Sequence, residues 1–382
     1  MQTQVFDKTE TQGFRELLQK YQSKSDYALP ANLIHMRDDG SVEAREYVTL
    51  GTEPVSFEAI PTDWAMHQIA EYIGMHWSYA KKLIQYPAMP LMAQNVNYWF
   101  SRNTEDRRLV RIFEGELIGF LSDMYRSIDN YDIFTWTQGT AAKIAAESGF
   151  ELQLVRPYLS ETRMNATILS SEFIQLEPGN DKDVYRMGIN LRNSEVGNGS
   201  FSIRPMLLRT SCQNSNIFAG HDDFIYKRIH RGSRIGIGQV QWSTDTQRLQ
   251  AGTIRAEIVD VVKAAFNKDL AMERVNMLRK LKDVPFTPSP ARVKATINVL
   301  GLGEKESDEI WAKLERNTRY EFLQAITNHA QTYYRKGADV ERGTELEELG
   351  GHLIMHQDVW DQIDRQTKKE EDKSSSNNSQ EA

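Results

Sequence analysis

The residues best suited to binding chemistry lie between positions 204 and 248. There, aromatic side chains alternate with cations in the segment FIYKRIHRGSR (residues 224–234), and a tryptophan follows at position 242. Cations neutralise phosphates and aromatic rings stack on unpaired bases, so this pattern is typical of a groove for single-stranded nucleic acid. The plainer interpretation is a solvated face above buried aromatic residues. The predicted phosphate contacts are Arg204, Arg209, Lys227, Arg228, Arg231 and Arg234, and the predicted stacking residues are Phe224, Tyr226 and Trp242.

Charge is unevenly distributed along the chain. Residues 204–294 contain 16 Lys and Arg against 8 Asp and Glu, a net charge of +8, whereas the whole chain has a net charge of −7. Such asymmetry favours one side that faces a polyanion on an otherwise acidic protein. For Arg209, which stands between Leu208 and Thr210, the alternative is an ion pair with a buried acid.

Cys212 is the single cysteine and has two histidines, His221 and His230, nearby in the sequence. A cysteine nucleophile needs such a base, but a lone cysteine more often serves as a small buried hydrophobic residue. Asp222 and Asp223 beside His221 are oxygen donors that a metal ion could use, although adjacent aspartates at a turn usually cap a helix or face water. We therefore predict no catalytic residue, no metal and no cofactor.

Two further patterns lack the residues that their chemistry requires. The glycine-rich segment GSRIGIG (residues 232–238) does not have the glycine, lysine and hydroxyl order of a phosphate-binding loop. His352 and His356 share one helical face, but no glutamate accompanies them as in helical zinc motifs. We predict neither a nucleotide loop nor a zinc site here.

Composition limits the class of protein. The 382 residues include 40% hydrophobic and 26% charged residues, the balance of a soluble globular chain. One cysteine excludes an intramolecular disulfide and fits a reducing compartment, so we expect a cytoplasmic protein. No apolar run approaches the length of a membrane span, and the first residues are polar, so we expect neither a membrane anchor nor a leader.

Most of the predicted β-strands lie in the central part of the chain, between residues 108 and 204. A turn-rich stretch, NLRNSEVGNG (residues 190–199), predicts a hairpin with a long polar tip. A helix over 137–148, stopped by Gly149, lies among the strands. Five segments are rich in β-forming residues: 108–113, 151–155, 164–169, 184–189 and 201–204. They predict an α+β core with an antiparallel sheet.

Helical periodicity marks both flanks of this core. Thr62 is a candidate helix cap, and Gly74 separates two short helices over 69–83 that resemble a helix-turn-helix unit, although a plain helical hairpin is the simpler interpretation. The last residues contain almost no hydrophobic side chain and predict disorder. We expect an N-terminal mostly helical segment (1–104), an α+β core (105–260), a C-terminal helical region (261–366) and a disordered tail (367–382).

Three stretches, taken in order, resemble the pattern of the phage and plasmid-related proteins of the domain-of-unknown-function 932 family. They are LSDMYRSIDN (residues 121–130), NSEVGNGSF with LRTSCQN (193–201 and 208–214), and IHRG (229–232). The resemblance covers roughly residues 60–355 and implies a mobile-element protein that acts in the host cytoplasm, in DNA metabolism. It implies no role for the matching positions, which are Ser122, Tyr125, Arg126, Asn193, Ser194, Gly197, Arg209, Cys212 and Asn214.

The leading hypothesis is a non-enzymatic protein that binds, and in an oligomer anneals, single-stranded DNA, with phage or host replication and recombination proteins as further partners. The second hypothesis is a protein-binding module that modulates a host or phage enzyme. The third is an enzyme that uses Cys212, or His221 with Asp222. Salt separates the first two, because binding to DNA weakens steeply as salt rises.

Overall fold

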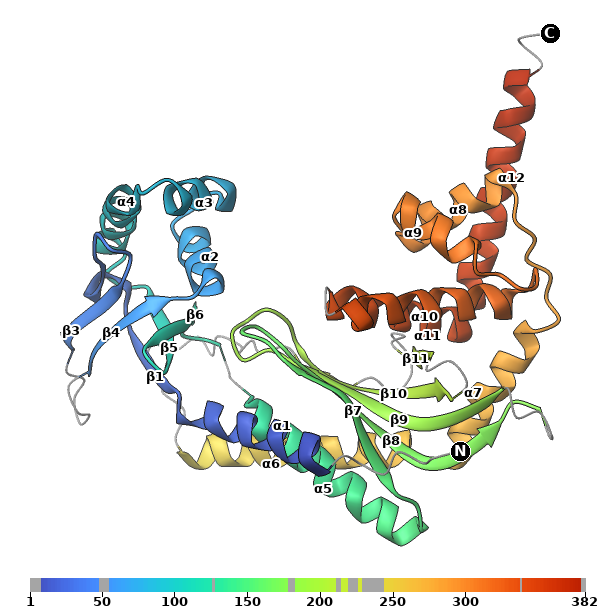
Figure 1. Cartoon of the computed structure of the whole chain (residues 1–382). Helices are drawn as coiled ribbons and strands as arrows, with labels where there is room; N and C mark the ends of the chain where they lie inside the picture. Colours follow the sequence, from blue (N-terminus) through green and yellow to red (C-terminus); the bar gives the residue numbers. More distant parts are fainter. Residues whose placement is uncertain are drawn as a thin grey trace.

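The computed structural model describes residues 8–47, 55–125, 128–177, 183–210, 214–218, 226–228, 244–336 and 339–378. These residues form two mixed or antiparallel sheets with helices packed around them (Figure 1). The α+β class predicted from the sequence is confirmed.

The first sheet lies in the N-terminal part of the chain, in the order β1-β5-β6-β4-β3-β2. Neighbouring strands are antiparallel except β4 and β6, which are parallel. Its strands are β1 (Ser25–Pro30), β2 (Ile34–Met36), β3 (Val42–Tyr47), β4 (Val55–Pro61), β5 (Arg107–Phe113) and β6 (Glu116–Ser122). Short 3-10 turns, η1 (Tyr21–Ser23) and η2 (Ala31–Leu33), flank β1.

Three helices cover this sheet and enclose a hydrophobic core of its own: α2 (Asp63–Tyr72), α3 (Trp77–Gln85) and α4 (Met89–Arg102). The Thr62 side chain accepts a hydrogen bond from the Ala65 amide, as predicted for a cap. Gly74 has a φ of +73°, which a residue with a side chain rarely adopts, and the chain turns there between α2 and α3.

The first sheet departs from the mostly helical segment that the sequence predicts up to residue 104. Four strands precede that position and two follow it, so the expected boundary between 104 and 105 falls within the sheet. The sequence pattern that would predict these strands is weak for two reasons. β1 is an edge strand that ends in Pro30, and β3 (VEAREY) carries three charged side chains.

The second sheet has the order β11-β10-β9-β8-β7, with β12 also paired to β10, and all its pairs are antiparallel. Its long strands include every β segment predicted between 151 and 204, and β9 and β10 form the predicted hairpin. The strands are β7 (Leu152–Leu159), β8 (Met164–Gln175), β9 (Val184–Asn193), β10 (Phe201–Arg209), β11 (Ser215–Ile217) and β12 (Tyr226–Arg228).

The two faces of the second sheet have different chemistry because residues alternate along each strand. In β9, Tyr185, Met187, Ile189 and Leu191 join the main hydrophobic core. Three helices pack on this apolar face: α1 (Lys8–Lys20), α5 (Asn130–Ser148) and α6 (Thr244–Ala265). The expected boundary after residue 260 falls inside α6.

The C-terminal helices gather at the other face of the second sheet, where α10 and α11 lie over it (Figure 1). Trp360 and Phe286 are buried among them, as expected of core aromatics. The helices are α7 (Lys268–Leu281), α8 (Pro290–Leu300), α9 (Glu304–Trp311), α10 (Arg319–Lys336), α11 (Val340–Met355) and α12 (Gln357–Asn378).

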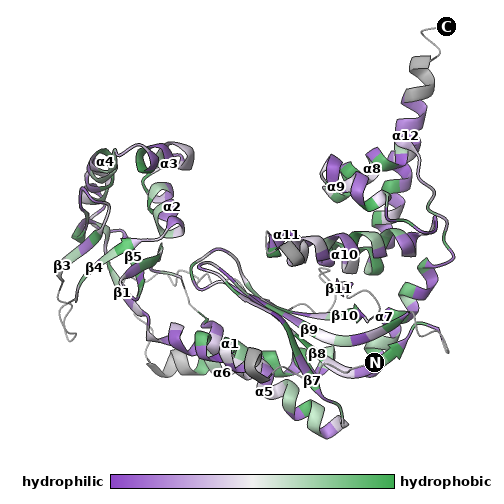
Figure 2. Ribbon diagram, viewed as in Figure 1, coloured by the Kyte–Doolittle hydropathy of each residue, from purple (hydrophilic) through white to green (hydrophobic). Residues whose placement is uncertain are grey.

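The end of the chain differs from the expected disordered tail up to residue 378. Helix α12 continues to Asn378, and Figure 2 shows hydrophilic residues in its middle part. Thr367 and Glu370 are buried, and the Glu370 carboxylate binds Lys294 at 2.7 Å. Packing against α8 therefore stabilises a segment whose composition alone predicts no order.

Among the described residues, we find no helix with the length and apolar character to cross a bilayer.

Candidate functional site

Several residues of the family-like stretches meet where the first sheet contacts the second. The loop after β9 enters this junction with Ser194 and Glu195, and the Tyr125 hydroxyl donates to the Ser194 carbonyl at 2.9 Å. The Gly197 amide in turn donates to the Tyr125 hydroxyl at 3.3 Å. Gly197 has a φ of +80°, and a Cβ there would lie 2.9 Å from Leu121, so the position requires glycine.

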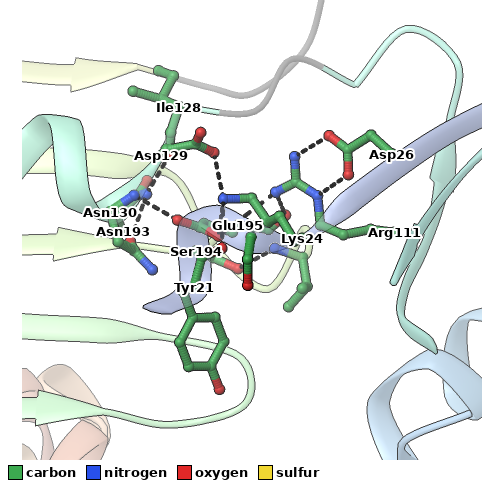
Figure 3. Close-up of polar contacts among 12 residues, drawn as sticks. Tyr21, Lys24, Asp26, Arg111, Ile128, Asp129, Asn130, Asn193, Ser194 and Glu195 are labelled. Carbon is green, nitrogen blue, oxygen red and sulfur yellow. Dashed lines mark hydrogen bonds and ion pairs between the residues drawn. The ribbon is translucent and has the colours of Figure 1, made fainter. Parts of the chain in front are cut away.

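Buried charges form the centre of this junction (Figure 3). The Glu195 side chain is 5% exposed and lies 3.1 Å from Lys24 Nζ, which also contacts Asp129 at 3.0 Å. Arg111 is fully buried, binds both carboxylate oxygens of Asp26 at 2.8 and 2.7 Å, and donates to the Glu195 carbonyl at 2.8 Å. Burial raises the pKa of Glu195, and the nearby Lys24 opposes that rise.

Amide groups complete the junction. Asn193 Nδ2 donates to the Ile128 carbonyl and to Asn130 Oδ1, both at 2.8 Å, and the Asn130 amide donates to Glu195 Oε1 at 2.5 Å. Every one of these groups is satisfied by another part of the chain, so Asn193, Ser194, Gly197 and Tyr125 have a structural explanation as a joint between the sheets. Ser122 acts locally, since its hydroxyl accepts from the Met124 amide at 3.2 Å.

A polar face with exposed and half-buried cations lies on the second sheet, opposite the apolar face. Cross-strand pairing sets Asn165, Arg192, Ser202 and Lys227 in one row across four strands. The next row contains Thr167, Asn190 and Arg204. Directly paired residues point to the same side of an antiparallel sheet, so Arg192, Arg204 and Lys227 share this polar face.

Helix α11 covers part of the polar face with carboxylates. Glu348 accepts from Arg192 at 3.4 Å and also from Arg204, so two guanidinium groups share one carboxylate. Burial and the nearby Arg192 lower the pKa of Arg204 to about 10. Further along α11, Glu347 accepts from Arg156 at 2.6 Å, and Thr344 accepts from Asn165 at 2.9 Å. Lys227, which is exposed, lies at the β12 end of the same face.

Arg209 belongs to a different cluster. It is five residues from Arg204 on the same strand, so it points to the opposite side of the sheet. Its guanidinium binds Asp183 at 2.6 Å, and the same carboxylate accepts from Lys282 and from the Tyr320 hydroxyl, each at 2.8 Å. This is the alternative that the sequence left open for Arg209, an ion pair with a buried acid.

The remaining predicted residues fall into two groups. Tyr226 and Arg228 lie on β12, and Asn214 is buried with its amide donating to the Gln324 carbonyl at 3.1 Å. Outside the described residues lie Phe224, Arg231, Arg234, Trp242, Arg126, Cys212, His221, Asp222 and Asp223. The His352 and His356 rings approach to 4.2 Å, but the described residues hold no cluster of three or more side chains that could bind a metal ion.

Sequence reasoning missed Arg192, Lys24, Arg111 and Glu195. A signal existed for two of them. Arg192 continues the alternation of polar and apolar residues in β9, and Arg111 interrupts the apolar run LVRIF, which predicts either an edge position or a buried partner. Lys24 and Glu195 have no local signal because their partners are distant in sequence.

Comparisons with protein-family models, with curated proteins and with solved structures gave no match, so the family resemblance stays a prediction and the site must be interpreted from its own geometry.

Proposed function

We propose that this protein binds single-stranded nucleic acid at the open edge of the polar face of the second sheet. The observation that carries the proposal is the cross-strand row of Asn165, Arg192, Ser202 and Lys227, which leads from beneath α11 to an exposed lysine. In the sequence, that lysine stands within the predicted binding segment of alternating aromatic residues and cations. A row of cations beside aromatic residues supports recognition of phosphates and bases together.

Charge also supports a polyanionic ligand. Arg192 and Arg204 face the single carboxylate of Glu348, so this trio retains one positive charge. An anion that approaches from the Lys227 edge reduces the repulsion between the two guanidinium groups. Arg204 and Arg209 are engaged in ion pairs within the fold, so they are not proposed as direct phosphate contacts. Lys227 is the proposed contact on the polar face. Arg228 is the next residue of β12 and pairs with Phe201 of the apolar side, so a strand that also meets Arg228, Arg231 and Arg234 must pass around the β12 edge.

The test is binding of a fluorescent single-stranded oligonucleotide and its duplex at about 50 and about 200 mM salt. The variant changes Lys227, Arg228 and Arg231 to Ala. Its matched control changes Lys143, Lys263 and Lys305, exposed lysines on other surfaces, so that the net charge falls equally. We expect the slope of log affinity against log salt to shrink by about 2 in the variant, because each lost phosphate contact removes about 0.7.

Three results would overturn the proposal: no binding at the lower salt, the same loss in the control, or binding insensitive to salt. Binding of a protein partner that does not change between the two salt concentrations would instead favour the alternative of a protein-binding module.

A further inference from the structure

The outward face of α4 exposes large apolar and aromatic side chains, which folded proteins usually bury. Leu91 and Tyr98 lie on one stripe, seven residues apart, and Trp99 lies beside it, about 100° further around the helix. The two aromatic residues are 52% and 46% exposed. The opposite side of the helix, with Val96 and Phe100, already packs into the core of the first sheet. The stripe is therefore apolar surface beyond what the fold uses.

The rings on this stripe are held in place by their neighbours. The Tyr98 and Trp99 rings meet edge to face at 5.3 Å, and the Arg102 guanidinium lies 4.5 Å from the centre of the Tyr98 ring. Rings fixed in this way offer a face for stacking with little loss of side-chain entropy on binding.

Helix α3, packed beside α4, adds the same two kinds of side chain. Tyr79 on α3 and Tyr86, the residue that directly follows α3, are exposed, and Lys82 lies between them in the sequence. Lys81 lies 5.4 Å from the centre of the Trp77 ring. Figure 1 shows α3 and α4 at the end of the N-terminal part that is turned away from the second sheet.

The sequence of α3 and α4 carries positive charge. Residues 72–104 contain Lys81, Lys82 and Arg102 and no Asp or Glu, while Glu71, Glu105 and Asp106 stand directly outside this range, in a chain whose net charge is −7. Exposed aromatic faces beside unopposed cations suit a ligand that combines planar rings with negative charge. A purely apolar partner helix would leave the cations unmatched, and duplex DNA would leave the rings without bases to stack on.

We propose that the α3–α4 surface is a second binding site, a platform on which bases of single-stranded nucleic acid stack over Tyr98 and Trp99 while Arg102, Lys81 and Lys82 face its phosphates. The inference rests on the proposed function for the class of ligand, but it concerns a different part of the molecule and has its own test.

The experiment compares two fluorescent oligomers of equal length, one of deoxythymidine and one abasic, in binding to the full chain. We expect wild type to prefer the base-bearing oligomer by about tenfold or more, because each stacked base contributes strongly to binding. In a variant with Tyr98→Ala and Trp99→Ala, this preference should fall to about twofold or less, any remainder coming from the aromatic residues of the proposed sheet-edge site. The variant with Tyr98→Phe and Trp99→Phe keeps the rings and should keep the preference.

Two controls separate stacking from general damage. Phe173→Ala removes another exposed aromatic ring, on β8, and should leave the preference unchanged. Thermal unfolding of the Ala variant should match that of wild type because both side chains are half exposed.

The outcomes for the two sites differ. Loss of Lys227, Arg228 and Arg231 should weaken binding of both oligomers and leave their ratio intact. If the triple variant binds as wild type does and the Tyr98 and Trp99 variant alone loses the preference, the platform holds and the sheet-edge proposal fails. Equal binding of both oligomers by wild type, tighter binding of duplex, or no binding at all would overturn the platform.

Discussion

Asp183 shows how one buried carboxylate can organise several cations. It accepts from Arg209, Lys282 and Tyr320. Burial alone would raise its pKa, but the hydrogen bonds from Lys282 and Tyr320 and the charge of Arg209 together hold the pKa below its ordinary value. A carboxylate whose pKa is lower in the folded state stabilises the fold above its unfolded pKa, and this contribution is lost as the pH falls through the folded pKa.

We therefore expect Asp183→Asn to lower the free energy of unfolding by about 3 kcal/mol at pH 7, because it leaves Arg209 and Lys282 without their buried partner. Urea denaturation measures this. The difference from wild type should shrink as the pH falls below about 4, where wild type loses the same contribution. Asp260→Asn, at an exposed position on α6, is the control. A difference that stays constant between pH 7 and pH 3 would contradict the assignment.

At the scale of elements, the contact between α11 and β11 depends on two consecutive glycines. A Cβ on Gly351 would overlap the carbonyl oxygen of Ile217, and one on Gly350 would overlap the Thr327 side chain. The helix backbone therefore lies directly on the strand, and this close approach places Glu347 and Glu348 over the arginines of the polar face.

Gly351→Ala should lower the free energy of unfolding by about 3 kcal/mol, because helix and strand must separate to admit the methyl group. Gly139→Ala, in the exposed middle of α5 with nothing near the added Cβ, should raise it by about 0.5 kcal/mol through better helix propensity. Thermal or urea unfolding of the two variants tests both signs. Equal changes in the free energy of unfolding for the two variants would show that the packing of α11 on β11 does not depend on the close approach at Gly351.

The elements that the sequence predicted correctly are those with local signals. Thr62, Gly74 and Gly149 mark helix ends or turns through their own chemistry, and the strands of the second sheet were predicted from their content of β-forming residues. Most of the first sheet was missed because β1 pairs with β5, which lies about eighty positions away in the sequence, and a short edge strand with charged neighbours lacks apolar periodicity.

The candidate site was predicted only in part for the same reason. Composition located Lys227 in a basic aromatic segment, but the position of Arg192 beside it depends on the register of β9, β10 and β12, which no local pattern reveals. Likewise, Arg204 and Arg209 look equivalent in sequence, and their opposite directions follow from strand geometry. From this region the sequence predicted only the helical pair over 69–83, which corresponds to α2 and α3, and the exposure of the α3–α4 surface cannot be deduced from the types of residue.

At the scale of the whole molecule, the first sheet and the second sheet have separate hydrophobic cores, joined by polar contacts and by a small apolar cluster of Phe113, Ile118 and Val196. Glu195 is the central group of that joint, with Lys24 and the Arg111 guanidinium against it. We expect Glu195→Ala to lower the free energy of unfolding by about 3 kcal/mol, because Lys24 loses a buried carboxylate at 3.1 Å and Arg111 loses one at 3.8 Å. Arg111 keeps its bonds to Asp26 and to the backbone carbonyl of residue 195.

Hydrogen exchange should show which strands the Glu195→Ala substitution destabilises. Amides in β1 and β5 should lose protection more than those in β8 and β9, because each sheet keeps its own core while their connection weakens. Glu147→Ala, at an exposed position on α5, should leave the exchange pattern unchanged. A uniform loss across both sheets would mean that the two cores unfold as one unit.

The junction also has a consequence for the order in which the protein matures during synthesis. Every strand of the first sheet precedes residue 123, so that sheet can pair its strands early in translation. Arg111, however, donates to a residue 84 positions later. A nascent chain that has not yet produced Glu195 must leave Lys24 and Arg111 only partly neutralised and in contact with water. The N-terminal sheet should therefore become rigid on the ribosome only after the β9–β10 hairpin has emerged and docked against it.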